Sequence, residues 1–400
     1  MRIRRCFALL VEPVEASTVD LAALFAGSPG FAVQTHWVGL AAHLDEPVPL
    51  TVADLQLLME VSDSVWSAVE ALGESSRVRA EALIVVGLLL AQSGGNAGAR
   101  ERDERVRGTH WHPHSAVVHA HSRWLAVSQR EDASAQFQDI GDMVSAYGPA
   151  PATSVEVGDA AAQITLPAPP AGAFDSILGR RKTVRNFAAT ELALDDFASV
   201  MQRTFGATQE VELAPGVSAI RRNSPSGGSL HPIDPYLLVQ RVRGLAPGLY
   251  HYNSVRHLLA PMLTTNALSM RGAGKEIRET ALAWVADQDW FADAPVMIVL
   301  VARFRRNFWK YRNHPKAYRA VVLDAGHLSQ MLYLAAAEIG LGAFITAAIN
   351  EHRIESDLGL DGLCDGPLAV VGFGAFGTGP WPEFAQDGNL QGRLRGHRAS

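Results

Sequence analysis

Apolar positions in the second half of the chain form several short runs and one long helical pattern. Residues 321–339 repeat apolar side chains at the spacing of a buried helix. Bounded apolar runs of strand length predict buried strands, which cover 236–242, 249–253, 296–302 and 367–372. Helices and strands mixed in this order predict an α+β domain over residues 172–385, followed by a tail at 386–400.

The first 95 residues carry a separate pattern of short elements. Thr51 supplies a helix-capping hydroxyl and Asp54 follows three residues later, the pairing of a capping box. Gly73 predicts the end of a helix. The predicted elements are a strand within 31–42, helices over 51–59, 65–72 and from 76, and a strand at 88–90. This order predicts a small winged-helix-like domain over residues 1–95.

Residues 96–171 read as a connecting region. A glycine-rich and charged break at 94–105 comes first, and an amphipathic helix is predicted at 132–147. The stretch 149–170 holds five prolines and many alanines. That composition is typical of an extended linker.

Five histidines between residues 110 and 121 raise the question of a zinc site. No cysteine or acid lies among them as a second ligand type, and Pro113 disrupts the helical spacing that would bring two histidines together. We therefore predict no metal site.

The composition is that of an ordinary soluble globular protein, with 48% hydrophobic and 19% charged residues. A net charge of −6 argues against nucleic-acid binding. Cys6 and Cys364 are too few for a disulfide framework and fit a reducing cytoplasm. The apolar runs at 6–11 and 82–91 are too short for a signal peptide and a membrane span, so we expect no membrane attachment.

Cationic side chains open the C-terminal domain. Three arginines and a lysine fall within residues 180–185, and Thr183 adds a hydroxyl among them. Such a cluster can hold a dianionic phosphate through charge-assisted hydrogen bonds. Further motifs follow in a fixed order, at Ser224–Pro232, Lys310–Tyr311, Leu323–His327 and Gly340–Gly342.

This ordered set resembles the flavin-dependent nitroreductase superfamily. More narrowly, it resembles the SagB-type dehydrogenases, which oxidise azoline rings in ribosomally made peptides. The resemblance covers roughly residues 172–378. It implies a nitroreductase-like fold, a homodimer, and flavin mononucleotide (FMN) at the subunit interface. It also implies a precursor peptide as substrate, a cyclodehydratase as partner, and a winged-helix-like domain that binds a leader peptide.

The resemblance also implies which residues contact the cofactor. The arginines and Thr183 would hold the phosphate and the ribityl chain, with Arg185 as a structural member of the motif. Small residues would let the backbone approach the flavin ring. The cofactor-binding residues implied in this way are Arg180, Arg181, Thr183, Arg185, Ser226, Gly227, Gly228, Gly340 and Gly342. The family pattern is lost at Leu230 and His231, where arginine and tyrosine are common.

Lys310 and Tyr311 are the catalytic candidates. Azoline oxidation removes a proton from a ring carbon as well as a hydride, so it needs a base. Six cations flank Lys310 between residues 303 and 319, and like charges favour the uncharged form of a lysine. The family uses a Lys-Tyr pair for this step. The alternative is a basic surface that contacts anionic peptide or FMN.

The predicted function is an FMN-dependent dehydrogenase that converts a thiazoline or oxazoline to the thiazole or oxazole during peptide maturation. Two alternatives stay open. One is an NAD(P)H-dependent reductase of small nitro compounds or quinones, and the other is a flavin-free scaffold that binds peptide in a modifying complex. A GxGxxG pattern at 372–377 follows a predicted strand, but the residues after it cannot open a helix, so we reject a Rossmann site.

Overall fold

The computed structural model describes residues 1–27, 30–129, 140–155, 158, 163–167, 169–170, 172–263, 266 and 274–378. The predicted tail at 386–400, the last residues of the predicted domain and the first half of the helix predicted at 132–147 lie outside the described residues. The second half of that helix is present as α6, Ile140–Tyr147.

A six-stranded antiparallel sheet forms the centre of the C-terminal unit, with strand order β11-β10-β9-β12-β14-β13. All four predicted strands are confirmed. The strands are β9 Ile233–Val239, β10 Gly248–Asn253, β11 Leu258–Pro261, β12 Val296–Arg303, β13 Gly342–Thr346 and β14 Asp365–Gly374. The glycines of the GxGxxG pattern lie within β14 and just after it, with no helix through residue 378.

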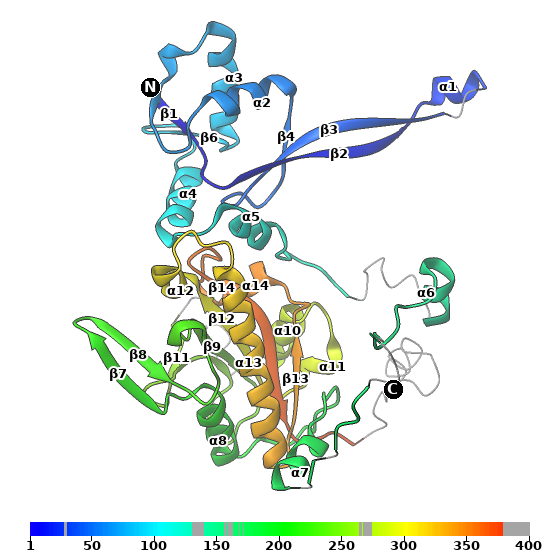
Figure 1. Cartoon of the computed structure of the whole chain (residues 1–400), viewed down its shortest axis with the longest axis vertical. Coiled ribbons are helices and arrows are strands. Elements are labelled where there is room, and N and C mark those ends of the chain that lie inside the picture. The colour runs from blue at the N-terminus through cyan, green and yellow to red at the C-terminus, as the bar shows by residue number, and fades with distance from the viewer. Residues whose placement is uncertain are drawn as a thin grey trace.

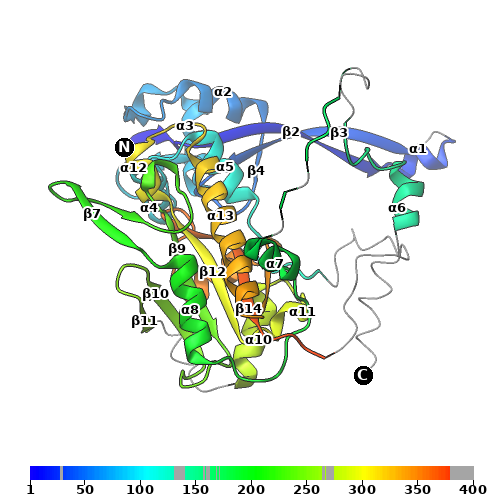
Figure 2. The same cartoon turned by 60° about the horizontal axis from the view of Figure 1, so that its bottom comes forward.

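Helices cover both faces of this sheet, as Figures 1 and 2 show. Alternate residues of β12 enter two separate apolar clusters, with Ile298 in one and Val299 in the other, because successive side chains of a strand point to opposite faces. One cluster includes α8 Leu194–Phe205 and α13 Ala317–Glu338. The other includes α10 Gly274–Trp284, α11 Asp289–Ala292 and α14 Glu351–Leu358.

Helix α13 is the helix predicted at 321–339. Its length and composition alone would suit a membrane span, but residues such as Val321, Leu328 and Leu332 are buried in the first apolar cluster, which identifies a core helix. Gly340 follows it with a φ of 77°, the left-handed conformation that ends many helices.

The N-terminal unit combines a small sheet of β1 Arg2–Arg5, β5 Ser67–Ala68 and β6 Leu89–Ala91 with two helices. The predicted capping box is confirmed at the start of α2 Val52–Glu60, where Thr51 and Asp54 exchange hydrogen bonds. The helix predicted from residue 76 is α3 Glu74–Val85.

The helix predicted at 65–72 is wrong. That segment forms strand β5 and a single 3₁₀ turn, Val69–Ala71. The Val69 amide donates to the Met1 carbonyl, so pairing with β1 overrides the local helical pattern. Gly73 consequently precedes α3 as its N-cap and ends no helix.

A long β-hairpin extends from the N-terminal unit away from the rest of the molecule (Figure 1). Strand β2 Leu9–Val19 pairs with β3 Phe31–Ala41 over their whole length, and α1 Leu21–Phe25 lies near the tip. Strand β4 Val48–Leu50 pairs with the base of β3. The strand predicted within 31–42 is therefore confirmed, whereas β2 was not predicted.

Helices α4 Ala97–Thr109 and α5 Pro113–His121 connect the two units. Trp111 between them is fully buried against Phe304 and Phe308 of α12 Phe304–Lys310, and its indole N–H donates to the Leu363 carbonyl at 2.8 Å. The chain then continues to α7 Ala173–Arg180 and to the hairpin of β7 Gln209–Ala214 and β8 Val217–Arg221.

Candidate functional site

The arginine cluster lies beside the C-terminal half of α13. Thr183 Oγ1 is 3.0 Å from the Tyr333 hydroxyl, and the Arg181 guanidinium carbon lies 5.5 Å from the centre of the Tyr333 ring. Arg180 donates from Nε to the Ala337 carbonyl at 3.1 Å. Arg180 therefore binds a backbone carbonyl in the last turn of α13. Arg181 and Thr183 present a cation and a hydroxyl on one side of the helix.

Two of the four glycines predicted near the flavin, Gly340 and Gly342, join this cluster. A methyl group on Gly342 would lie 1.9 Å from Val184 Cγ2, so only glycine lets β13 approach this closely. The Val184 amide donates to the Ala343 carbonyl at 2.8 Å. Arg180, Lys182 and Gly340 line a cavity of about 380 Å³ here. Arg185 does not join them, since its guanidinium lies over the Phe291 ring in the other apolar cluster.

A second cavity, of about 400 Å³, lies farther along the same two elements. Gly326 of α13 lines it and is seven residues from Tyr333, which places both on one face of the helix about 10 Å apart along its axis. Ala347, just after β13, also lines this cavity. It is four residues, or roughly 13 Å, from Ala343, which bonds Val184. We call the face between these points the α13–β13 groove. Arg181 lies at one end of this face, and the cavity at the other end is lined largely by apolar side chains, including Val322, Ala325, Ile345 and Leu368.

Neutral polar groups lie at the apolar end of the groove. Burial lowers the pKa of His119 to about 3 and raises the pKa of Tyr318 to about 12. His119 Nε2 faces the Gly362 carbonyl at 2.8 Å and must donate to it, so Nδ1 accepts from the Tyr318 hydroxyl at 3.2 Å. Glu351 accepts from the Trp124 amide, and burial raises the pKa of this carboxyl to about 7. Arg123 also lines the cavity and is paired with Glu355, so the cavity offers hydrogen-bonding groups beside one neutralised ion pair.

The serine-glycine loop meets the predicted catalytic pair at a different place. Ser226 Oγ donates to Asp324 of α13 at 2.5 Å and the Gly227 amide donates to the same carboxylate at 3.3 Å. Gly228 has a φ of 65°, and a methyl group on it would lie 2.6 Å from the Tyr311 hydroxyl and 2.8 Å from Lys310 Nζ. The loop and the Lys310–Tyr311 pair therefore form one contact.

The two groups of predicted residues do not meet within one chain. Asp324, which holds the serine-glycine loop, is nine residues from Tyr333, which holds Thr183. Nine residues are two and a half helical turns, so the two contacts lie on opposite faces of α13 and roughly 14 Å apart along it. Sequence reasoning placed both groups around one cofactor, whereas the structure of the single chain divides them.

Several residues of the groove had no sequence signal. Tyr333 and Glu351 are single residues in ordinary helical sequence, and Glu351 meets Tyr318 only because residues of α13 and α14 line one cavity. Asp324 lies in the motif at 323–327 but was not assigned a contact. His327 of that motif is exposed on α13.

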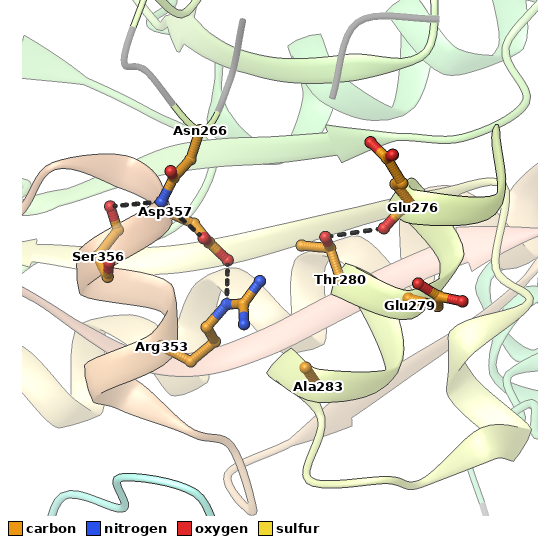
Figure 3. A pocket seen from close by; sticks show the side chains of 8 residues that line it. All are labelled: Asn266, Glu276, Glu279, Thr280, Ala283, Arg353, Ser356 and Asp357. Atoms are coloured by element: carbon orange, nitrogen blue, oxygen red, sulfur yellow. Dashed lines mark hydrogen bonds and ion pairs between the residues drawn. The ribbon is translucent and has the colours of Figure 1, made fainter. Parts of the chain in front are cut away.

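A further cavity, of about 550 Å³, contains none of the predicted residues. Figure 3 shows its lining, which combines Glu276 and Glu279 of α10 with Arg353 and Asp357 of α14. Asp357 is buried and accepts from the Trp284 indole at 2.9 Å and from Arg353 at 2.8 Å. The bond from Trp284 joins α10 to α14, while the Arg353 bond lies within α14, and we assign this cavity a structural role.

The match with a family model falls on the same part of the chain. The nitroreductase family model matches residues 178–375, which include every predicted site residue. The chain is 26% identical to protein MJ1384 of Methanocaldococcus jannaschii over 185 residues, 46% of this chain and 83% of that protein.

Two similar proteins have names that refer to peptide processing. The chain is 29% identical to the trifolitoxin-processing protein TfxB of Rhizobium leguminosarum bv. trifolii, over 45% of this chain and 46% of TfxB. It is 27% identical to the microcin B17-processing protein McbC of Escherichia coli, over 40% of this chain and 57% of McbC. These matches span about half the length of either relative.

Among solved structures, the Escherichia coli microcin synthetase McbBCD complex with truncated pro-MccB17 bound is similar at 20% identity and a TM-score of 0.44. The similarity covers 70% of this chain and 93% of the matched chain.

Proposed function

Because residues 178–375 form a nitroreductase-family domain, we propose that this chain is an FMN-dependent oxidoreductase that matures a ribosomally made peptide. The observation that carries the proposal is the α13–β13 groove, whose two ends match the two ends of a flavin nucleotide. The names of TfxB and McbC support peptide processing over reduction of small molecules.

The residues of the groove fit FMN. An anionic phosphate joined through a ribityl chain to a planar ring system needs a cationic end and a largely apolar slot some distance away. Arg181 and Thr183 would hold the phosphate end, and the cavity beside Gly326 and Ala347 would hold the ring system. When bound, FMN supplies a two-electron acceptor for a hydride.

The reaction that we propose is oxidation of a thiazoline or oxazoline ring to the aromatic azole. One ring carbon loses a proton and its neighbour loses a hydride, so that a carbon–carbon double bond forms. Lys310 accepts the proton through Nζ. The Tyr311 hydroxyl, which shares the contact with Gly228, orients the lysine.

A complete site needs a second copy of the chain. Within one chain the groove and the Lys310 group lie on opposite faces of α13. Between them α13 exposes Leu323 at 63%, and Val322, which lines the groove, is 47% exposed, so a second subunit placed here would cover both apolar side chains. We therefore propose a homodimer in which the groove of one subunit faces Lys310 of the other.

The first test concerns the flavin. Purified protein should be yellow, and replacing both Arg180 and Arg181 with alanine should remove FMN, because Arg181 holds the phosphate and Arg180 fixes this segment to the end of α13. The flavin-to-protein ratio from the absorbance spectrum measures this, with circular dichroism to confirm folding. The matched control is Arg243→Ala, which removes an exposed arginine in the loop that follows β9. Full occupancy in the double variant would refute the phosphate assignment, and a colourless wild-type protein would favour the scaffold alternative.

The second test concerns the dimer. Light scattering should give about twice the chain mass of 43.0 kDa. Lys310→Ala and the Arg180→Ala/Arg181→Ala variant should each be inactive, but mixed and reassembled subunits should regain activity, because one of the two sites in a heterodimer then has an intact groove and an intact lysine. If mixing restores nothing while mixed dimers form, the site lies within a single chain.

We also propose that residues 1–95 bind a leader peptide, at the free edge of β5, and that a cyclodehydratase supplies the azoline substrate in the cytoplasm. Ser67 and Ala68 of β5 are exposed at the sheet edge, where a peptide strand could add. A peptide with its leader should bind more tightly than the same peptide without it, as measured by fluorescence anisotropy. Ala68→Pro should abolish that difference, and equal affinities in the wild type would contradict the proposal.

A further inference from the structure

A cavity of about 690 Å³ opens between α12 and the β7–β8 hairpin. We call it the basic groove, and its walls include Leu213, Val217, Arg303, Arg305, Trp309 and Lys310. The cations come from α12 and the end of β12, and the apolar side chains come mainly from the hairpin. Of the residues used in the proposed chemistry, Lys310 and Gly228 line the groove, and its other side chains have no role there.

The charges of the basic groove are only partly neutralised. Arg306, which also lines it, donates to the carbonyls of Leu230 and Ser218 at 2.7 and 3.1 Å, and Arg303 pairs with Asp234 at 3.2 Å. Among the described residues, Arg305 has no hydrogen bond or ion pair. Asp365 is the one acid that lines this cavity. The groove thus keeps a net positive charge and at least one cation free to bind an anion.

The hairpin forms a fixed wall rather than an edge for strand addition. Arg306 holds the outward carbonyl of Ser218 at 3.1 Å. With this β8 carbonyl already bonded, side chains of the groove are the main groups left to recognise a ligand. Leu213 and Trp309 are 68% and 51% exposed and offer an apolar contact beside the cations.

We propose that the basic groove binds an acidic and partly apolar segment of the substrate peptide next to Lys310. Carboxylates of the peptide pair with Arg305 and Arg303, and an apolar side chain packs on Trp309. The mixture of cations and apolar surface fits an amphipathic peptide better than a nucleic acid, whose approach the net charge of −6 also opposes. This inference rests on the proposed function, since it specifies the composition of the peptide.

The test uses the full chain and fluorescein-labelled synthetic peptides. One short peptide contains glutamate and phenylalanine spaced by glycine, and a second has lysine in place of each glutamate. A single-stranded oligonucleotide of matched charge serves as the competing polyanion. Anisotropy is measured for wild type, Arg305→Glu and Trp309→Ala, with Arg243→Glu as an exposed charge-reversal control distant from the groove.

We expect the acidic peptide to bind wild type and to lose about ten-fold in affinity with Arg305→Glu, the scale of one charge-assisted hydrogen bond. Added salt should weaken binding, and Arg243→Glu should leave it unchanged. The inference is overturned if Arg305→Glu has no effect, if the lysine peptide binds as well, or if the oligonucleotide binds more tightly through Arg305.

The outcome is separable from that of the proposed function, because peptide binding is measured without turnover. If the protein binds the acidic peptide but carries no flavin, the proposal for the basic groove stands and the proposed oxidoreductase function is wrong. If the protein is yellow and oxidises azolines but binds the acidic and basic peptides alike, the proposed oxidoreductase function stands and the proposal for the basic groove is wrong.

Discussion

Replacing Lys310 with alanine is expected to lower turnover of an azoline peptide by ~10²–10⁴-fold, the range for loss of a general base. The protein should still fold and bind FMN, because Lys310 is exposed and lies on the opposite side of α13 from the α13–β13 groove. Lys310→Arg should not restore activity, since a guanidinium stays protonated and cannot accept the proton. Tyr311→Phe should have a smaller effect if the tyrosine only orients the lysine.

The measurement for Lys310 separates proton removal from the overall reaction. Mass spectrometry follows the loss of two hydrogens from the ring, and incubation in deuterium oxide follows exchange of the ring hydrogen. Wild type should show both, and Lys310→Ala should show neither at a comparable rate. If the alanine variant loses the hydrogens at the wild-type rate, the base lies elsewhere and the basic groove serves only to bind peptide.

Replacing Arg123 with methionine is expected to destabilise the protein by about 3–5 kcal/mol, the cost of leaving a buried charge without its partner. Arg123 donates to both oxygens of Glu355 at 2.8 and 2.9 Å, and the two side chains are only 2% and 8% exposed. This pair joins the chain after α5 to α14 beside the α13–β13 groove. Its loss should therefore also loosen FMN binding.

A matched exposed pair provides the control for Arg123. Arg278 and Asp293 are also 2.8 Å apart but are 46% and 50% exposed, so Arg278→Met should cost no more than about 1 kcal/mol. Urea unfolding measures both. The double variant Arg123→Met/Glu355→Leu should recover much of the loss, since no charge is left buried. An equal effect of the two single variants would show that burial of the Arg123 pair is unimportant.

The pH dependence of the Arg123 variant has a definite sign. Burial already raises the pKa of Glu355, and Arg123 opposes that rise, so removing the arginine raises the pKa further above its unfolded value. A carboxyl with a raised folded pKa favours folding when protonated and loses that contribution as pH rises. The loss of unfolding free energy in Arg123→Met should therefore be largest near neutral pH. It should shrink as the pH falls toward the ordinary pKa of a glutamate.

Local patterns were sufficient for much of the C-terminal domain. The strands at β9, β10, β12 and β14 and the helix α13 were predictable because each is an apolar run or repeat within one segment. The capping box at Thr51 was predictable for the same reason, since its bonds join residues three apart. The arginine cluster, the Lys310–Tyr311 pair and the resemblance that they carry also lie in continuous sequence.

Long-range pairing decided what the sequence alone could not. Residues 65–72 became a strand and a turn because β1, more than sixty residues away, offered backbone partners. The α13–β13 groove and the basic groove are each assembled from segments far apart in the chain. Above all, α13 places the two groups of site residues on its opposite faces. Only the helical geometry between Asp324 and Tyr333 shows that one chain does not hold them together. The sequence determined which residue types are present. Contacts between distant segments decided which of these residues meet, because a local pattern does not contain the energies of such contacts.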